Sequence, residues 1–383
     1  VPNLRFEGFE NDWRIHKLGD ITKSCGGGTP STKNNRYWEG NIPWISSSDL
    51  FDNDIRTISI NRHITNDAIL NSSAKLCPKS TICIVSRVGV GKVAVSKCEI
   101  CTSQDFMNII EYDGNKYFLA QLIQIIIKST QLQGTSIKGI TSKEINNFKL
   151  QIPTISEQDK IMQFLELIED RIQTQSKIID LYTSLIKSIE DNIFWNNTDY
   201  HSLPIKKILT EIIEKSIIQN QYPILSSTKQ GIFLQSEYFN KEAASSNNIG
   251  YKITHKGDII ISPQNLWMGN INYNDKFENG LVSPSYHIYQ INKMFNPIYI
   301  SEILKTRRAL FMYKTISEQG ASIVRRNLNI DAFSELYFPI PDRKKQDEIS
   351  LIISKLHQKI NIEKCLLDQY KNQKNYLLRN MFI

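Results

Sequence analysis

The chain of 383 residues contains two copies of one sequence unit, and this repeat limits its fold more than any other feature. The segment IPTISEQDKI at Ile152 recurs as IPDRKKQDEI at Ile340, and the same offset then continues without gaps to the C-terminus. The identical pairs are Ile152/Ile340, Pro153/Pro341, Gln158/Gln346, Asp159/Asp347, Ile161/Ile349, Ile172/Ile360, Asp180/Asp368, Tyr182/Tyr370, Asn192/Asn380 and Phe194/Phe382. Looser matches precede them, such as PWISSS with PILSST and QGTSI with QGASI. We therefore predict two tandem copies, each a variable globular part followed by a well-matched part; the alternative is two unrelated domains that share a helical motif.

The well-matched part of each copy is predicted to be a long helix. Pro153 and Pro341 end the preceding extended segments, Ser156 is the expected N-cap, and Glu157 and Asp159 put negative charge into the first turn, where the helix dipole favours it. Seam residues then recur at alternating spacings of four and three, the a/d pattern of a coiled coil. The first seam is Ile161, Leu165, Ile168, Ile172, Gln175, Ile179, Tyr182, Ile186, Ile189 and Ile193, and the second is Ile349, Ile353, Leu356, Ile360, Glu363, Leu367, Tyr370, Lys374, Leu377 and Met381.

The charges of the two helices favour pairing with each other. Residues 156–194 carry four basic and eight acidic side chains, whereas residues 342–382 carry nine and five. Opposite net charge disfavours self-pairing, and the polar seam residues Gln175, Glu363 and Lys374 are expected to help set the register. A helix of roughly 39 residues is about 58 Å long, which suits a spacer. The alternative is that each helix packs only on its own domain.

The fold class is predicted to be α+β, with two mixed α/β domains in tandem. We place the domains at residues 1–150 and 198–338 and the spacer helices at residues 151–197 and 339–383. Short β-rich runs such as STICIV and GKVAVS lie among Gly, Ser and Asn, and a helical run closes each domain. Residues 1–155 carry 18 basic and 14 acidic side chains, and residues 195–341 carry 15 and 12. The formal net charge of +7 therefore resides in the globular parts, which permits a polyanionic partner.

The sequence offers no convincing active site or metal site. GVGK at Gly89 lacks the spacing of a phosphate-binding loop and has Val93 where a Ser or Thr is required. Cys98 and Cys101 form one CxxC without a second pair, and six cysteines are too few for a disulfide scaffold. No apolar stretch approaches the roughly 20 residues of a membrane helix, and residues 1–13 show no secretory signal. We therefore expect a cytoplasmic chain without a membrane partner or a cofactor of its own.

DNA contact is the better supported chemistry. Gly and Ser amides with Lys or Arg suit phosphate oxygens, and Arg, Gln and Asn pair with base edges. The repeated loops SRVGVGK and SPQNLWMGN, together with the serine loops, are the predicted places of base readout. The candidates are Gly27, Thr29, Ser46, Ser47, Ser48, Arg87, Lys92, Ser136 and Lys138 in the first copy, and Ser226, Ser227, Thr228, Lys229, Gln264, Asn265, Trp267, Ser322, Arg325 and Arg326 in the second. The alternative for each of them is a solvated loop residue.

The segments LRFEGFENDWRIHKLGDI, GGGTPSTKNNRYWEGNIPWISSSDL and IPTISEQDKI followed by a long helix resemble the specificity (S) subunit of type I restriction-modification systems. The resemblance covers essentially the whole chain. It implies two target-recognition domains that alternate with two conserved helical regions, the helices forming an antiparallel coiled coil. It also implies a bipartite, asymmetric target in double-stranded DNA, with one half-site for each domain.

The resemblance further implies that the chemistry belongs to partners. Methyltransferase (M) subunits would dock on the chain and methylate adenine N6 with S-adenosylmethionine, and restriction (R) subunits would add an endonuclease that depends on ATP and Mg²⁺. The chain has no NPPF-like or DPPY-like motif, as expected for a subunit that is not an enzyme by itself. Two alternatives remain open at this point. One is a coiled-coil adaptor that scaffolds two protein-binding domains, and the other is a stand-alone nuclease or NTPase.

Overall fold

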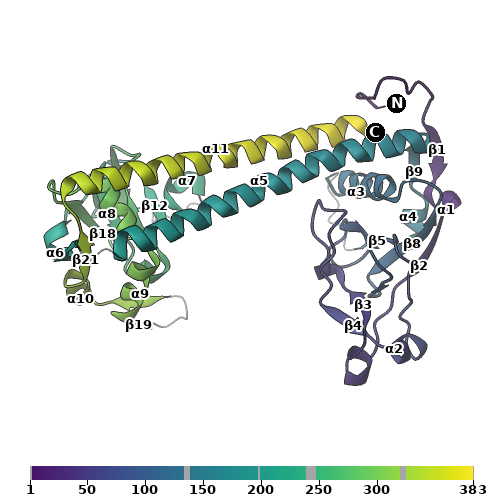
Figure 1. Ribbon diagram of the computed structural model, residues 1–383, viewed down its shortest axis with the longest axis horizontal. Helices are drawn as coiled ribbons and strands as arrows, with labels where there is room; N and C mark the ends of the chain where they lie inside the picture. Colours follow the sequence, from purple (N-terminus) through teal and green to yellow (C-terminus); the bar gives the residue numbers. More distant parts are fainter. Residues whose placement is uncertain (1, 133–138, 197–198, 239–246, 320–324, 383) are drawn as a thin grey trace. The chain divides into compact units, whose positions relative to one another are not determined.

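The computed structural model describes residues 2–132, 139–196, 199–238, 247–319 and 325–382 (Figure 1). The chain forms two compact units. Unit 1 comprises Val1–Thr174 with Leu367–Ile383, and unit 2 comprises Gln175–Leu366. Each unit thus contains one globular domain and a part of both long helices. The units are not consecutive blocks of sequence, because each long helix contributes to both.

A four-stranded antiparallel sheet of the same topology forms the centre of each domain. In unit 1 its order is β2 (Thr22–Gly26), β8 (Phe106–Tyr112), β5 (Ile82–Val85) and β6 (Val93–Val95). In unit 2 its order is β11 (Leu209–Ile212), β18 (His287–Ile291), β15 (Asp258–Ile261) and β16 (Ile271–Tyr273). Strands β5 and β15 are buried along their whole length, consistent with the apolar run ICIV in β5 and the three isoleucines that follow Asp258 in β15. The weak sequence similarity of the globular parts therefore still encodes one shared scaffold.

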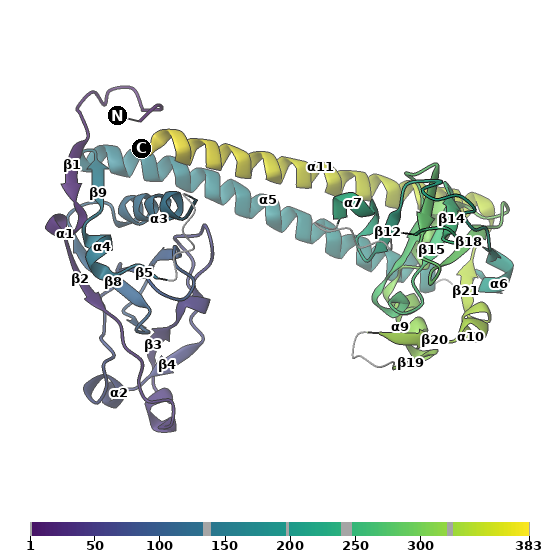
Figure 2. The same ribbon diagram turned by 180° about the vertical axis from the view of Figure 1, so that it is seen from behind.

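Smaller elements complete each domain (Figures 1 and 2). In unit 1 they are β1 (Arg14–Lys17), α1 (Leu18–Ile21), β3 (Ile42–Ile45), β4 (Arg62–Ile64), α2 (Asn66–Leu70), β7 (Cys101–Thr102), α3 (Lys116–Leu132), α4 (Ser142–Asn146) and β9 (Lys149–Ile152). In unit 2 they are β10 (His201–Pro204), α6 (Ile205–Ile208), β12 (Leu225–Thr228), β13 (Gly231–Leu234), α7 (Gln235–Tyr238), β14 (Lys252–His255), β17 (Asn279–Val282), α8 (Pro297–Ile303), α9 (Arg307–Thr315), β19 (Ser317–Gln319), β20 (Arg326–Leu328), α10 (Ile330–Ser334) and β21 (Tyr337–Ile340). Antiparallel pairing of β1 with β9, and of β10 with β21, closes each domain on itself.

The two long helices are α5 (Ile155–Trp195) and α11 (Arg343–Met381). In unit 1 the beginning of α5 packs antiparallel to the end of α11, and in unit 2 the end of α5 packs antiparallel to the beginning of α11 (Figures 1 and 2). Every predicted seam residue is buried or half-buried, which confirms the heptad pattern. The predicted N-cap is wrong: α5 already includes Ser156, and the N-cap position falls to Thr154, whose carbonyl accepts hydrogen bonds from the Glu157 and Gln158 amides.

Polar seam residues contact each other as expected for register-setting groups. In unit 2, Gln175 Nε2 donates to Glu363 Oε2 at 2.5 Å and to the Glu363 carbonyl at 3.2 Å. These two residues occupy the same position of the repeat, so the pairing follows an approximate two-fold symmetry. In unit 1, Lys374 forms an ion pair with Glu169 across the seam. The opposite net charges of the helices thus meet in at least one direct contact.

The repeated Gln-Asp pair anchors each long helix to its domain. In unit 1 the Asn115 amide donates to Gln158 Oε1 at 3.0 Å, and Asn115 Nδ2 donates to Asp159 Oδ1 at 2.7 Å. In unit 2 Asn296 does the same toward Gln346 (2.8 Å) and Asp347 (2.7 Å). Asn296 Oδ1 also accepts from the first amides of α8 and caps that helix. The repeated Gln and Asp therefore anchor the beginning of each long helix to its domain.

A phenylalanine that is also repeated, Phe194 or Phe382, anchors the C-terminal end of each long helix. In unit 1, Phe382 is 3% exposed and stacks on Phe118 of α3, with ring centroids 5.0 Å apart. In unit 2, Phe194 is fully buried and meets Tyr299 of α8 edge to face, also at 5.0 Å. Each long helix therefore begins in one unit and has its last residues in the core of the other unit. A continuous apolar core results in each unit, because helix ends and central sheet share it.

Candidate nucleic-acid interface

The glycine-rich segment after β2 is shaped by close packing. A Cβ at Gly27 would lie 2.2 Å from the Ser103 carbonyl and from Thr102 Oγ1, so only glycine fits there. Thr29 Oγ1 donates a hydrogen bond to Gln104 Oε1. Packing by itself explains Gly27, whereas Thr29 remains part-exposed on the segment that Gly27 positions.

The first serine loop is organised by an arginine that the sequence reasoning missed. Ser46 and Asp49 form a capping box around Ser47–Asp49. Arg62 of β4 donates to Ser46 Oγ at 2.6 Å and to Asp49 Oδ2 at 2.5 Å, and its guanidinium stacks 4.6 Å from the Trp44 ring. Ser48 Oγ lies 2.9 Å from Ser46 Oγ. An Arg that follows a Trp by eighteen residues carries no local signal, so only the fold could reveal this contact.

The loop after β5 lies next to the first serine loop. Lys92 Nζ donates to the Ser47 carbonyl at 3.4 Å, which brings the two predicted DNA-contact loops together. Arg87 is exposed at the beginning of the loop after β5. The Ser86 carbonyl accepts from the Ile140 amide at 2.7 Å, so the segment after α3 holds the base of this loop. The predicted candidates Ser136 and Lys138 lie outside the described residues.

The second serine segment is largely buried, in contrast to the first. Ser226 and Ser227 are 7% and 3% exposed. Ser227 Oγ donates to Asn270 Oδ1 and accepts from Asn272 Nδ2, both at 2.8 Å, and Asn272 Oδ1 accepts from Lys305 Nζ at 2.8 Å. This network satisfies the serine inside the domain. The exposed part of the segment is its turn, where Thr228 is half-buried and Lys229 is exposed.

The loop after β15 is built around Trp267. Lys314 Nζ and the Arg326 guanidinium lie 5.8 and 5.9 Å from the Trp267 ring. Arg326 Nε also donates to Ser317 Oγ at 2.8 Å, and the Arg326 amide donates to the Gln264 carbonyl at 3.1 Å. Arg326 thus links three segments of unit 2, a role that its position in a basic pair did not indicate.

Polar side chains flank this Trp267 cluster. Gln264 is exposed, whereas Asn265 Oδ1 is buried and finds no hydrogen-bond partner in the described part of the chain. Arg325 is exposed, and Ser322 lies outside the described residues. Of the predicted residues of the second copy, the loop after β15 and β20 thus bring Gln264, Trp267 and Arg326 together.

The two domains hold their central loops in the same way. In both, the loop follows the buried central strand, and an amide from the segment after the closing helix holds a carbonyl at its base: Ile140 to Ser86 in unit 1, Arg326 to Gln264 in unit 2. The exposed side chains differ, with Arg87 in one loop and Gln264 in the other. A common frame with different exposed groups can present different hydrogen-bonding patterns to a ligand.

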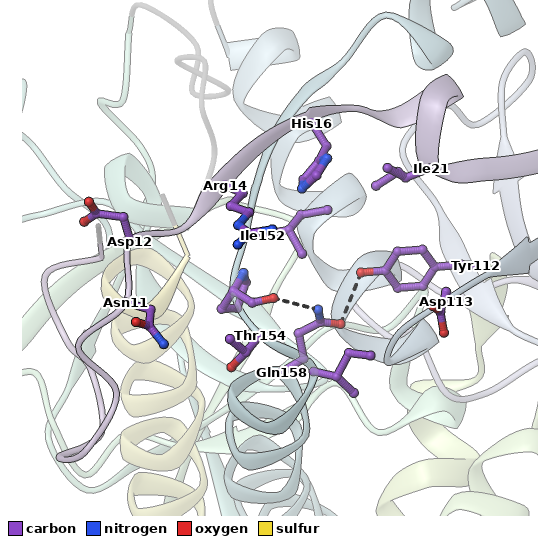
Figure 3. Close-up of a pocket in the computed structure, with 12 residues that line it drawn as sticks. Asn11, Asp12, Arg14, His16, Ile21, Tyr112, Asp113, Ile152, Thr154 and Gln158 are labelled. Carbon is purple, nitrogen blue, oxygen red and sulfur yellow. Dashed lines mark hydrogen bonds between the residues drawn. The ribbon is translucent and has the colours of Figure 1, made fainter.

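An open pocket of about 870 Å³ lies in unit 1 between β1, β9 and the beginning of α5 (Figure 3). Its polar lining includes Arg14, His16, Asp113 and Tyr112, whose hydroxyl donates to Gln158 Oε1 at 3.1 Å. Burial raises the pKa of Tyr112 to about 12, so this phenol stays protonated at neutral pH. The hydrogen bonds from Tyr112 to Gln158 and from Gln158 to the Pro153 carbonyl, which line this pocket, belong to the helix anchor.

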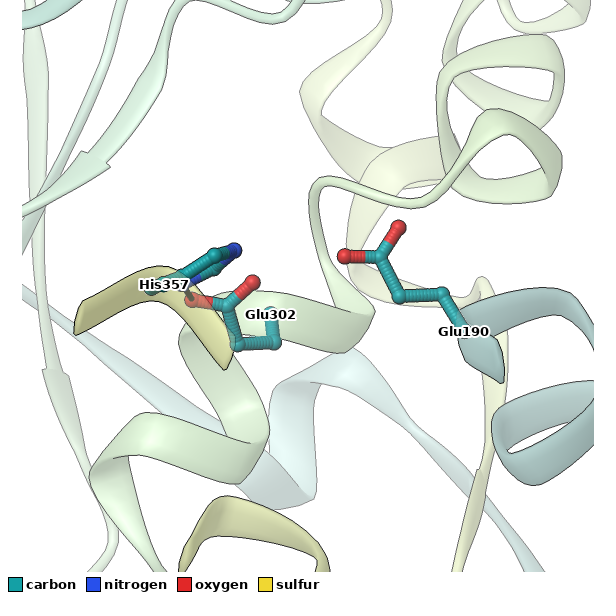
Figure 4. Close-up of side chains that lie close together, drawn as sticks. All are labelled: Glu190, Glu302 and His357. Carbon is teal, nitrogen blue, oxygen red and sulfur yellow. Dashed lines mark ion pairs between the residues drawn. The ribbon is translucent and has the colours of Figure 1, made fainter. Parts of the chain in front are cut away.

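One cluster in unit 2 has the composition of a metal-ligand set (Figure 4). Glu190 of α5, Glu302 of α8 and His357 of α11 place ligand atoms within 4.8 Å of one another. Burial and the neighbouring Glu302 raise the pKa of Glu190 to about 7. His357 Nδ1 lies 3.6 Å from Glu302 Oε1, and burial raises the pKa of Glu302. Burial thus favours the protonated, neutral form of both glutamates, which reduces the repulsion between them.

Within the described residues, no helix is both long and apolar enough to cross a membrane.

Part of the chain is similar to a known type of domain. Residues 10–181 match the model of the type I restriction modification DNA specificity domain. The MjaIX specificity subunit of a type I restriction enzyme from Methanocaldococcus jannaschii is 35% identical over 192 residues, which is 48% of this chain and 44% of that protein. The EcoR124I/EcoR124II specificity subunit from Escherichia coli is 35% identical over 175 residues, or 43% and 42% of the two chains. The matched segment thus spans less than half the length of these relatives.

Solved structures share the fold along the whole chain. The S subunit of the type I restriction-modification system from M. genitalium superimposes with a TM-score of 0.55 at 15% identity and covers 100% of this chain and 99% of its own. A chain from a study of complex assembly and conformational transition of the type I R-M system gives a TM-score of 0.62 at 13% identity, with 97% of both chains covered. The expected α+β architecture with two tandem domains and paired long helices is confirmed, as is the resemblance to specificity subunits.

Proposed function

We propose that the chain is the DNA specificity subunit of a type I restriction-modification complex, because residues 10–181 match the model of the type I restriction modification DNA specificity domain. Each of its two domains reads one half of a bipartite, asymmetric target in double-stranded DNA. The chain acts in the cytoplasm and performs no chemistry itself. Methyl transfer and DNA cleavage reside in the subunits that assemble with it.

The observation that carries this proposal is the duplicated frame with different exposed groups. Two sheets of one topology carry the loops after β5 and β15, and in each a backbone hydrogen bond holds the loop: Ile140 to Ser86, the first residue after β5, and Arg326 to Gln264, the third residue after β15. Arg87 suits the O6 and N7 acceptors of guanine, whereas Gln264 suits the N6 donor and N7 acceptor of adenine. Two such domains on one chain read two unlike half-sites, and their basic excess attracts the phosphate backbone.

The proposed partners follow from the same premise. Methyltransferase (M) subunits bind S-adenosylmethionine and methylate adenine N6, and the adenine is rotated out of the duplex into their pocket, since the stack covers it. Restriction (R) subunits join this core and supply a nuclease that depends on ATP and Mg²⁺. The similarity of the chain to specificity subunits supports this assembly.

Binding of DNA by the assembled complex tests the proposal. The chain is co-expressed with its methyltransferase (M) subunit, and the complex is titrated with a library of duplexes that is sequenced after selection. We expect enrichment of one motif made of two short specified blocks with unspecified base pairs between them. Binding that shows no sequence preference, although both subunits co-purify, would contradict the proposal and favour an adaptor that only scaffolds proteins.

A further inference from the structure

Two cysteine thiols meet in the first domain, next to the glycine-rich segment that follows β2. Cys25 is half-buried on β2, and Cys77 is 1% exposed and pairs through its backbone with Ile100. Their Sγ atoms lie 3.6 Å apart although the residues are 52 positions apart in the sequence. Both are free thiols. The fold thus places a more accessible sulfur next to a buried one.

The surroundings assign different roles to the two sulfurs. A hydrogen bond from Cys77 and the positive charge of Lys75 lower the pKa of Cys25 to about 7, whereas the same hydrogen bond, together with burial, raises the pKa of Cys77. Cys25 is therefore the thiolate of the pair, and Cys77 is the thiol that can follow it. Nearby Cys83 is fully buried, and burial raises its pKa to about 12, which leaves it unreactive.

A buried amide faces the same place. Asn108 of β8 lies opposite Cys25 in the register of β2 with β8, and opposite Cys83 in the register of β5 with β8. It is fully buried, and its Oδ1 has no hydrogen-bond partner among the described residues. An unsatisfied carboxamide oxygen beside the thiol pair offers an acceptor for the hydroxyl of an oxidised sulfur.

We propose that Cys25 and Cys77 form a reversible modification site, at which a hydroperoxide converts the two thiols into a disulfide. The Cys25 thiolate attacks the peroxide, an S–O bond forms as the O–O bond breaks, and hydroxide leaves, or alkoxide from an organic peroxide. Cys77 sulfur then attacks Cys25 sulfur, the S–S bond forms, and the S–O bond breaks. The departing hydroxide takes the Cys77 proton and leaves as water. Two electrons pass from the two thiols to the peroxide.

The step requires a small local movement. The sulfurs must approach from 3.6 Å to the bond length of about 2.05 Å. Cys25 lies at the end of β2, immediately before the glycine segment, whereas Cys77 is fixed in the core. The movement therefore falls on β2 and on the glycine segment that follows it.

Peptide mapping of the full chain tests this proposal independently of DNA binding. The protein is treated with hydrogen peroxide, its free thiols are alkylated, and it is digested without reductant for mass spectrometry. We expect a Cys25–Cys77 cross-linked peptide that dithiothreitol removes. In Cys77→Ser the cross-link is absent, and Cys25 is recovered as a sulfenic acid that dimedone labels. The matched control Cys365→Ser, which removes an exposed cysteine on α11, leaves the cross-link unchanged.

Recovery of Cys25 and Cys77 as alkylated thiols, at peroxide levels that oxidise Cys365, would overturn the proposal. A cross-link from Cys25 to Cys83 in place of Cys77 would overturn it as well, because the geometry assigns Cys77 as the partner.

Discussion

Replacing Gln346 by Met is expected to destabilise unit 2 by about 2–4 kcal/mol. Gln346 is 2% exposed, and its side chain joins α11 to the domain. Its Oε1 accepts from the Asn296 amide at 2.8 Å, and its Nε2 donates to the Pro341 carbonyl at 2.8 Å. Met has a similar length but neither group, so the substitution removes the hydrogen bonds while it keeps most of the packing.

The magnitude follows from the two groups that lose their partner. The Pro341 carbonyl is buried, and an unpaired buried polar group costs about 1–3 kcal/mol. The Asn296 amide is only part-buried, so leaving it without a hydrogen-bond partner costs about 1 kcal/mol of stability. Asn296 keeps its contact with Asp347 at 2.7 Å, so α8 should stay capped. The loss is therefore expected in the stability of the anchor, with the helix itself preserved.

Hydrogen exchange of the α8 and α11 amides in unit 2 measures this loss locally, and urea unfolding measures it globally. Lys344→Met is the matched control, because Lys344 is exposed in the same helical turn and should change stability by less than about 0.5 kcal/mol. Gln158→Met makes the equivalent change in unit 1 and also removes the Tyr112 hydrogen bond, so its effect should be at least as large. An effect of Gln346→Met no larger than that of the control would refute the anchoring argument.

Three further predictions concern charge and length. The pKa of Glu190 is raised to about 7, so its contribution to stability is full below its ordinary pKa and is lost as pH rises through 7. Glu190→Gln should therefore raise the unfolding free energy by about 1–2 kcal/mol at pH 8, after allowance for solvent screening. At pH 4 the same substitution should leave the unfolding free energy unchanged. Arg87→Ala should weaken DNA binding by the assembled complex and reduce the slope of log K against log salt by about one, whereas Lys206→Ala, which removes a lysine paired with Glu335, should not. Insertion of one heptad into both α5 and α11 adds about 10 Å of helix and should widen the unspecified gap of the DNA motif by about three base pairs; an unchanged gap would refute the spacer role.

The sequence predicted the repeat, the long helices and the seam because each of these is a local or periodic pattern. It identified Gln158 and Gln346 as repeated but could not give their partners, since Asn115 and Asn296 lie 43 and 50 residues away. Single asparagines in loops carry no signal for such a contact. The N-cap was predicted two residues too late: serine is a favoured N-cap residue, but the helix already begins at Ile155, before Ser156.

The candidate interface was predictable only in outline. Ser46 and Ser227 cannot be told apart by residue type. In the structure Ser46 is part-exposed beside Arg62, whereas Ser227 is buried against Asn270 and Asn272. Burial of a serine depends on strands that are distant in sequence, so loop composition cannot distinguish these cases. What the sequence did indicate correctly is that the loops after the two central strands are equivalent and differ in side chains.

Sequencing of adenine methylation across the genome of the host, with and without the gene for this chain, tests the central claim most directly. The account predicts that deletion abolishes N6-methyladenine at one bipartite, asymmetric motif, and that the gene supplied in trans restores it. Substitution of Arg87 should relax one half of that motif, and substitution of Gln264 the other half. Retention of every methylated motif after deletion would contradict the account.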